Sequence, residues 1–393
     1  MSSYITDTVT FGHLFEESPK TLQEYIANTE KEWLFRSICY LIGINTVDSY
    51  SYRCQSFIDM FFQDYLENET VIAIKDKINK IQGKYPPHLN VVLTFTHPGT
   101  TLIFLRECLL LNPNGKSKES FEDLMNLFKA YLVTSENRVE RLKAILNNID
   151  KEDRFKDAKI HIAQGLQDFG LIEYNIHDLT TTQELKCLAF CNYLEKNRLF
   201  KNTQDRFLRE NNFSNFFDFF LKAIFPLKVY QPSKFKEGFI ALEEQDFIGG
   251  RRDLWNELLP FWNNISITIT NIEETRKKLS NFRDYTCFKE YPLLKINDHK
   301  FLVVSPYYYA LTLYDGFKQK VKSTYEKEYK GARVDFNSCV TSNFSEHILF
   351  YQIMSQMLGK NNYVVLNGKF FEERSIPGRP DLYIRNKKDI FIF

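Results

Sequence analysis

Apolar side chains recur every three or four positions through most of the first 280 residues of this chain, and this spacing predicts helices. Phe57, Phe61 and Tyr65 are four residues apart and would form one apolar helix face. The same spacing occurs in segments 32–42, 120–132, 138–146 and 183–194. Residues 86–87 and 112–115 are rich in Pro, Asn and Gly, so we expect loops there.

Residues 138–181 have a pattern that allows two interpretations. Predicted helices at 138–148 and 155–166 are followed by short apolar segments at 171–174 and 178–180. Two helices and a small β-wing are the layout of a winged helix, whose second helix enters a DNA groove. Lys156, Lys159 and His161 would then contact phosphates. An ordinary helix pair followed by a β-turn fits the same pattern.

From about residue 281 the pattern becomes that of strands mixed with helices. Segments 291–296 and 301–304 flank Asn297-Asp298 and predict a β-hairpin. A helix at 307–321, a charged linker at 322–333 and a helix at 343–358 follow. Strands are expected at 363–372, 381–385 and 390–393, with a hairpin turn at 386–388. The chain is therefore predicted to be α+β and multidomain, with a large, mainly helical region 1–280 and an α/β region 281–393.

The amino-acid composition limits the classes of protein to which this chain could belong. The chain has 393 residues, of which 44% are hydrophobic and 26% charged, and its net charge is +1. This balance excludes a strongly basic coat for nucleic acid but allows a local basic groove. No apolar run approaches the roughly 18 residues that predict a membrane span. Seven scattered cysteines favour a reducing cytoplasm, and Cys187 and Cys191 are expected to be buried thiols.

Two carboxylates are the candidate metal ligands. Asp381 follows Gly378-Arg379-Pro380 and begins a predicted strand, and Glu346 lies on the apolar side of the predicted helix 343–358. A carboxylate directed toward a core needs a compensating cation, and Mg²⁺ prefers such oxygen ligands. Each residue also has a structural interpretation. Asp381 would be a turn aspartate, and Glu346 would form a capping box with Asn343.

A helix glutamate, then strands, then Gly-x-Pro-Asp-Leu and an apolar strand resemble the PD-(D/E)XK nuclease superfamily. The resemblance covers about the last fifty residues. It implies a restriction-endonuclease-like domain in which Glu346 and Asp381 are the catalytic, metal-binding residues of Mg²⁺-dependent DNA hydrolysis. The superfamily also uses an acid-x-Lys on the next strand, which Asp389-Ile390-Phe391 does not supply. We therefore expect that half of the motif to follow Phe393 and the present domain to be incomplete and inactive.

The partners implied by the resemblance are DNA and Mg²⁺. Four basic residues near the candidate site are expected to contact the DNA backbone, although each would also suit a solvated hairpin: Lys369, Arg374, Arg379 and Arg385. The leading hypothesis is a DNA endonuclease in bacterial restriction or phage defence. The alternative is a non-catalytic DNA-binding or scaffold protein with a degenerate nuclease fold. The helical region would serve recognition, a homodimer contact or a partner protein.

Overall fold

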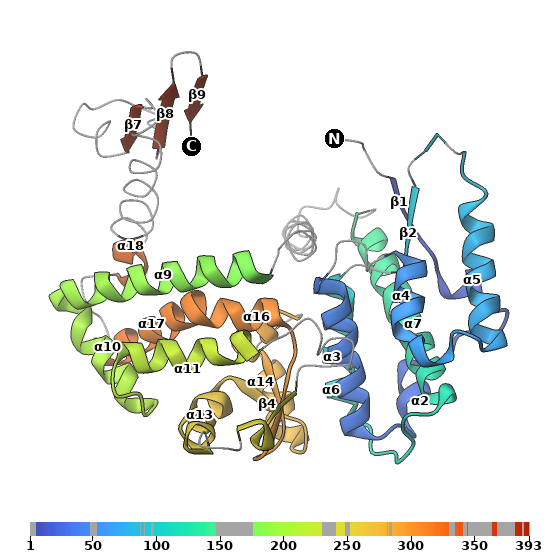
Figure 1. Cartoon of the computed structure of the whole chain (residues 1–393), viewed down its shortest axis with the longest axis horizontal. Coiled ribbons are helices and arrows are strands. Elements are labelled where there is room, and N and C mark those ends of the chain that lie inside the picture. Colours follow the sequence, from blue (N-terminus) through green and yellow to red (C-terminus); the bar gives the residue numbers. More distant parts are fainter. Residues whose placement is uncertain are drawn as a thin grey trace. The chain divides into compact units, whose positions relative to one another are not determined.

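The protein is α+β, as predicted, with many helices and small sheets (Figure 1). The computed structural model describes residues 5–47, 53–86, 88–89, 91–95, 98–146, 176–229, 241–247, 252–280, 282, 285–329, 335–340, 344, 364–367, 382–386 and 389–392. Contacts divide the chain into two compact units. Unit 1 comprises residues 1–180 and 224–312, and unit 2 comprises residues 181–223 and 313–393.

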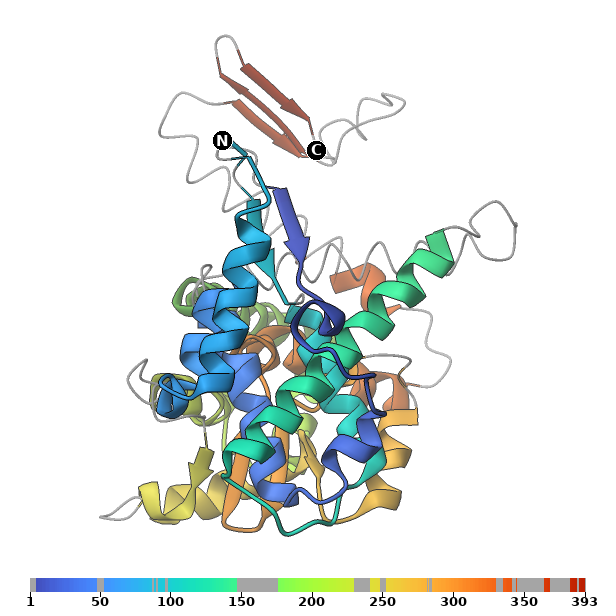
Figure 2. The ribbon, with the colours of Figure 1, turned by 90° about the vertical axis from the view of Figure 1, so that its right-hand side faces the viewer.

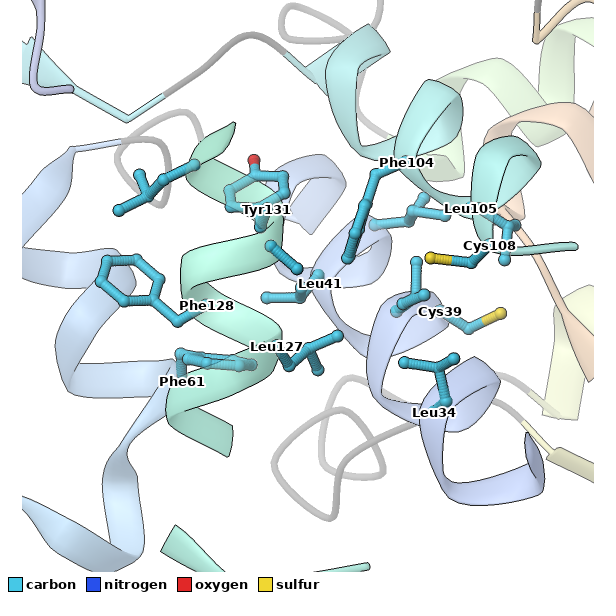
Figure 3. Packing of buried hydrophobic residues seen from close by; sticks show 14 of the residues in the cluster. Leu34, Cys39, Leu41, Phe61, Phe104, Leu105, Cys108, Leu127, Phe128 and Tyr131 are labelled. Carbon is cyan, nitrogen blue, oxygen red and sulfur yellow. The ribbon is translucent and has the colours of Figure 1, made fainter. Parts of the chain in front are cut away.

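Unit 1 begins with a group of helices. They are α1 (Phe11–Leu14), α2 (Leu22–Ile26), α3 (Lys31–Val47), α4 (Cys54–Phe61), a 3₁₀ turn (Gln63–Tyr65), α5 (Glu69–Gln82), α6 (Pro98–Leu111) and α7 (Phe121–Leu146). Figure 3 shows the side chains of Leu34 and Cys39 on α3 close to those of Leu105 and Cys108 on α6. The apolar spacing seen in the sequence therefore marks faces that are buried in the structure.

Aromatic rings fill the part of this core around α7. Phe128 is fully buried, and its ring centroid lies 5.1 Å from that of Phe95 and 5.6 Å from that of Phe62. Both pairs are edge-to-face, an arrangement that ring electrostatics favour. Phe57 and Phe61 also pack against Phe128. The high Phe content of the sequence thus serves ordinary core packing here.

The loop that precedes α7 is confirmed and is held tightly. Gly115 has its backbone against Asn28, where an added Cβ would lie 1.8 Å from the Asn28 carbonyl carbon. The Ser117 amide donates to the Asn28 carbonyl, and the Ser117 carbonyl accepts from the Glu30 amide. A glycine is therefore required by the close approach of the two backbones.

Two sheets belong to unit 1. In the first, β1 (Ile5–Thr8) pairs in parallel with β2 (Val91–Thr94). In the second, the strand order is β3 (Ala241–Glu243), β6 (Lys300–Val303), β5 (Leu293–Asn297) and β4 (Ser266–Thr268), with β4 parallel to β5. The predicted hairpin is confirmed as the antiparallel pair β5–β6. The associated helices are the 3₁₀ helix Glu244–Phe247, α13 (Arg252–Asn264), α14 (Ile272–Ser280), α15 (Cys287–Glu290) and α16 (Pro306–Leu311).

One hydrophobic core joins this four-stranded sheet to the N-terminal helices. Ile267 of β4, Leu294 of β5 and Leu34 of α3 are all fully buried members of it. Strands on both sides of residue 280 therefore share a sheet and a core. The division of the chain at that position into a recognition region and a nuclease-like region stays a prediction.

Unit 2 is built on helices. They are most of α9 (Ile176–Lys196), α10 (Arg198–Glu210), the first half of α11 (Phe216–Val229), a π-helical turn (Thr312–Gly316), α17 (Phe317–Glu328) and α18 (Phe336–Cys339). Phe317 stacks on Phe219 at 4.8 Å, and its ring lies 5.2 Å from that of Phe207. Cys187 and Cys191 are buried in this unit, as expected.

The structure describes only the two ends of the region in which a winged helix was one interpretation, so that interpretation stays a prediction except for its second β-segment, which is wrong. Segments 120–132 and 138–146 belong to the single helix α7, because neither Gly nor Pro interrupts them and Val133, Thr134 and Ser135 are buried. Residues 178–180, expected in the β-wing, lie in the first turns of α9. The predicted second helix, with Lys156, Lys159 and His161, lies outside the described residues.

The predicted charged linker at 322–333 is also wrong over its first half. Residues 322–328 continue α17, because Thr324 and Tyr325 are buried against the rest of unit 2 and Lys322 pairs with Glu326 one turn later. The charged residues of this segment lie on a helix, so a high charge density alone does not indicate a linker. Of the helix expected at 343–358, the structure describes only residue 344.

Candidate metal site at the C-terminal sheet

The predicted C-terminal strands are confirmed as an antiparallel three-stranded sheet, drawn as the dark red arrows in Figure 2. Its strands are β7 (Val364–Asn367), β8 (Leu382–Asn386) and β9 (Asp389–Ile392), with β8 in the centre. Asn386 pairs with Asp389, so only two residues connect β8 to β9. Alternating apolar residues and a short connection are typical of a hairpin, which is why the sequence revealed this sheet.

Of the two candidate ligands, Asp381 adjoins this sheet in the sequence. Asp381 immediately precedes Leu382, the first residue of β8, and Leu382 pairs with Asn367 of β7. The last pair between β8 and β9 is Tyr383 with Ile392. Five of the six predicted site residues lie outside the described residues: Glu346, Lys369, Arg374, Arg379 and Asp381. The convergence of Glu346 and Asp381 on one metal ion therefore stays a prediction.

Arg385 is the predicted site residue that the structure does place. It lies on the central strand, paired with Val364 of β7 on one side and Ile390 of β9 on the other. Paired residues on neighbouring strands share a face of the sheet. The register thus pairs Arg385 with one aliphatic residue on each neighbouring strand.

The described residues offer little other chemistry. No group of three or more His, Cys, Asp or Glu side chains in the described ranges could hold a metal ion. Burial raises the pKa of the Cys39, Cys54, Cys108 and Cys191 thiols far above its ordinary value. A raised pKa favours the protonated thiol, which is a poor nucleophile, so these four cysteines are not candidates for the catalytic residues.

A charged cluster in unit 1 was not predicted from the sequence. Lys300 Nζ lies 2.8 Å from Glu32 Oε1 and 2.8 Å from Glu243 Oε1. Burial alone would lower the pKa of Lys300, but its hydrogen bonds to Glu243 and Glu32 raise it overall. A lysine held in its protonated form cannot act as a base. The cluster ties α3 to β3 and β6, and its members are too far apart in the sequence to form a recognisable motif.

The two units carry opposite net charges. Unit 2 contains 20 Lys and Arg residues against 14 Asp and Glu residues, so its formal net charge is +6. Unit 1 contains 31 and 36 respectively, so its net charge is −5. The near-neutral charge of the whole chain therefore hides a cationic unit, and that unit contains the C-terminal sheet. An excess of cations favours an anionic partner for unit 2.

No family model, characterised protein or solved structure matches this chain. Among the described residues, no helix has both the length and the hydrophobicity that crossing a bilayer requires. The resemblance to the PD-(D/E)XK superfamily therefore stays an expectation drawn from the sequence motif alone.

Proposed function

We propose that this protein is a Mg²⁺-dependent endonuclease that hydrolyses DNA phosphodiester bonds. The observation that carries the proposal is the position of Asp381, one residue before the central strand of an antiparallel three-stranded sheet. This is the order of elements that the resemblance to the PD-(D/E)XK superfamily implies. Bacterial restriction or phage defence is the setting that the same resemblance suggests.

In this proposal, Glu346 and Asp381 hold the metal. Carboxylate oxygens are the ligands that Mg²⁺ prefers, so the donor set suits this ion. Bound there, Mg²⁺ would activate a water molecule and stabilise the negative charge that develops on the phosphate.

The charge of unit 2 supports an anionic substrate. Its net charge of +6 contrasts with −5 for unit 1, so a DNA backbone would be attracted to the unit that contains the candidate site. Binding that depends on charge gains free energy from the release of counterions from the DNA. This gain is smaller at high salt concentration, so the binding weakens as salt is added. The charge alone does not distinguish cleavage from simple binding, so cleavage needs its own test.

Nicking of a supercoiled plasmid by the full-length gene product tests the proposal. We expect nicking in Mg²⁺, none with a chelator, and none from Asp381→Asn in either condition. Asp335→Asn is the matched control, because Asp335 caps α18 by accepting from the Ser338 amide at 2.8 Å and asparagine caps equally well. Undiminished nicking by Asp381→Asn would exclude the proposed metal site.

The alternative function is a non-catalytic DNA-binding or scaffold protein, and two observations favour it. The described residues of β9, Asp389–Ile392, contain no acid-x-Lys. Large apolar side chains are also exposed on unit 2, namely Leu185, Phe217 and Leu221 at 63%, 66% and 61%. Exposed apolar residues suit a protein partner or a second copy of the chain. Tight DNA binding without nicking by the full-length product would support this alternative.

A further inference from the structure

Two lysines of unit 2 lie over the same aromatic ring. Lys186 Nζ of α9 is 5.9 Å from the centroid of the Tyr314 ring, and Lys318 Nζ of α17 is 5.1 Å from it. The two ammonium groups are therefore at most about 11 Å apart, the sum of these distances. An aromatic ring attracts cations at this range, so Tyr314 gathers positive charge from two helices that are distant in the sequence.

The Tyr314 ring has a fixed place in the core of unit 2. It is buried, and the Phe190 ring of α9 packs edge-to-face against it at a centroid distance of 5.7 Å. Tyr314 belongs to the π-helical turn Thr312–Gly316, between α16 and α17. Such turns are rare within helices and are frequently found at functional sites. A fixed ring limits where the two ammonium groups lie, so little further ordering is needed when a ligand binds them.

Positive charge exceeds negative charge around this ring. Asp315 Oδ1 lies 3.9 Å from Lys318 Nζ, and Asp315 Oδ2 accepts a hydrogen bond from Gln183 Nε2 at 3.4 Å. Among the described residues, no acid lies within ion-pair distance of Lys186. Both lysines are half-buried, and burial of a cation costs free energy unless an anion compensates it. One acid thus faces two cations, and the surplus positive charge suits a bound anion.

We propose that Lys186 and Lys318 together bind one phosphate group. A phosphate has several strong acceptor oxygens, so each ammonium group can donate to a different oxygen of the same phosphate. The net charge of +6 on unit 2 attracts such an anion from solution. The phosphate belongs to a nucleic-acid backbone or to a free nucleotide, two sources that share this chemistry. The inference goes beyond the proposed function, because it requires neither the metal nor cleavage.

Protection of lysines from acetylation in the full chain tests this site without a substitution. The wild type is treated briefly with an amine-acetylating reagent in the presence of a chelator, and the modified lysines are identified by mass spectrometry. A duplex oligonucleotide, adenosine monophosphate or neither is added. At a ligand concentration about ten times the dissociation constant, we expect acetylation of both Lys186 and Lys318 to slow about tenfold. Lys201, exposed on α10 of the same unit, is the internal control and should react equally in all three samples.

The two ligands separate the sources of the phosphate. Protection by the oligonucleotide alone would assign the site to a nucleic-acid backbone, and protection by the nucleotide alone would assign it to a free nucleotide. Protection by both would show a site for the phosphate group itself. Each of these results supports the inference.

A double variant, Lys186→Gln with Lys318→Gln, provides a second measurement. It removes both charges and keeps polar side chains of similar length over the Tyr314 ring. We expect the ligand that protects the lysines to bind this variant about tenfold more weakly, as for the loss of a charged hydrogen bond. For the oligonucleotide, the slope of log K against log salt should also fall by about one, because one phosphate contact is lost. Lys201→Gln is the matched control and should bind like the wild type.

Two results would overturn the inference. The first is equal acetylation of Lys186 and Lys318 with and without either ligand, at every ligand concentration up to the millimolar range. The second is a folded double variant that binds the ligand with unchanged affinity, since the two lysines would then only pack against Tyr314. Failure of the proposed function is a separate result. Protection of both lysines in a protein that never nicks DNA would refute the nuclease and uphold the phosphate site.

Discussion

The two compact units have similar cores and opposite charges. Each is packed with aromatic rings, around Phe128 in unit 1 and around Phe317 in unit 2. Their net charges, however, are −5 and +6. The core composition therefore shows how each unit is stabilised but nothing about a partner, whereas the charge difference is the basis on which we propose an anionic partner for unit 2. The whole-chain average of +1 hides this difference.

The largest loss of stability is expected from a substitution in the core of unit 1 that leaves unit 2 intact. Phe128 is completely buried among five other rings, so Phe128→Ala removes packing that cannot be regained. We expect the free energy of unfolding of unit 1 to fall by about 3–5 kcal/mol, measured by urea titration with a probe in that unit. DNA affinity should not change while unit 1 remains folded.

The matched control for this variant is Phe217→Ala. The Phe217 side chain is 66% exposed on α11, so its removal should cost less than about 0.5 kcal/mol. If Phe128→Ala abolished DNA binding under conditions where unit 1 is still folded, the assignment of binding to unit 2 alone would be wrong. The difference in net charge between the units would then not explain where DNA binds.

A smaller loss of stability is expected when Asp218, an acidic residue of the cationic unit 2, is replaced. Asp218 Oδ1 lies 2.6 Å from Lys222 Nζ, and Asp218 Oδ2 accepts from the Ser214 amide at 2.8 Å. Burial alone would raise the pKa of Asp218, but hydrogen bonds from Lys222 and Ser214 outweigh burial and lower it. The stabilisation is therefore complete above the unfolded pKa, near 3.8, and is lost as the pH falls through the lower folded value.

Asp218→Asn should accordingly destabilise unit 2 by about 0.5–1 kcal/mol at neutral pH, as for an i,i+4 ion pair with one backbone hydrogen bond. The difference from wild type should shrink as the pH drops below about 4. Urea midpoints at several pH values provide the measurement, and Asp205→Asn, exposed on α10, is the control. A difference that is independent of pH would show that the charge of Asp218 is not what stabilises this part of unit 2.

Elements whose signal is local were predictable from the sequence. The hairpin β5–β6 and the sheet β7–β9 have alternating apolar residues with short connections, and their partners are close in sequence. Helices such as α3 and α4 follow from apolar spacing. The parallel pair β1–β2 joins residues more than eighty positions apart, and the sequence of neither strand indicates which strand it pairs with. Such pairings depend on the tertiary fold rather than on local pattern.

In the candidate site, too, only the local features could be predicted from the sequence. The sequence shows Asp381 at the start of a strand and a carboxylate at Glu346, because both features are local. Whether the two meet depends on how the segment between them folds. The Lys300 cluster with Glu32 and Glu243 shows the same limit, since three distant segments contribute to it. The pairing of Arg385 with Val364 and Ile390 likewise depends on the strand register, which the sequence does not give.

Metal binding by the full-length gene product tests the central claim most directly. Mn²⁺, which accepts the same oxygen ligands as Mg²⁺ and is visible by electron paramagnetic resonance, is titrated into the wild type, Asp381→Asn and the control Asp335→Asn. We predict that the wild type and the control bind the ion alike and that Asp381→Asn binds it more than about tenfold more weakly. Equal binding by all three proteins would contradict the proposed carboxylate site.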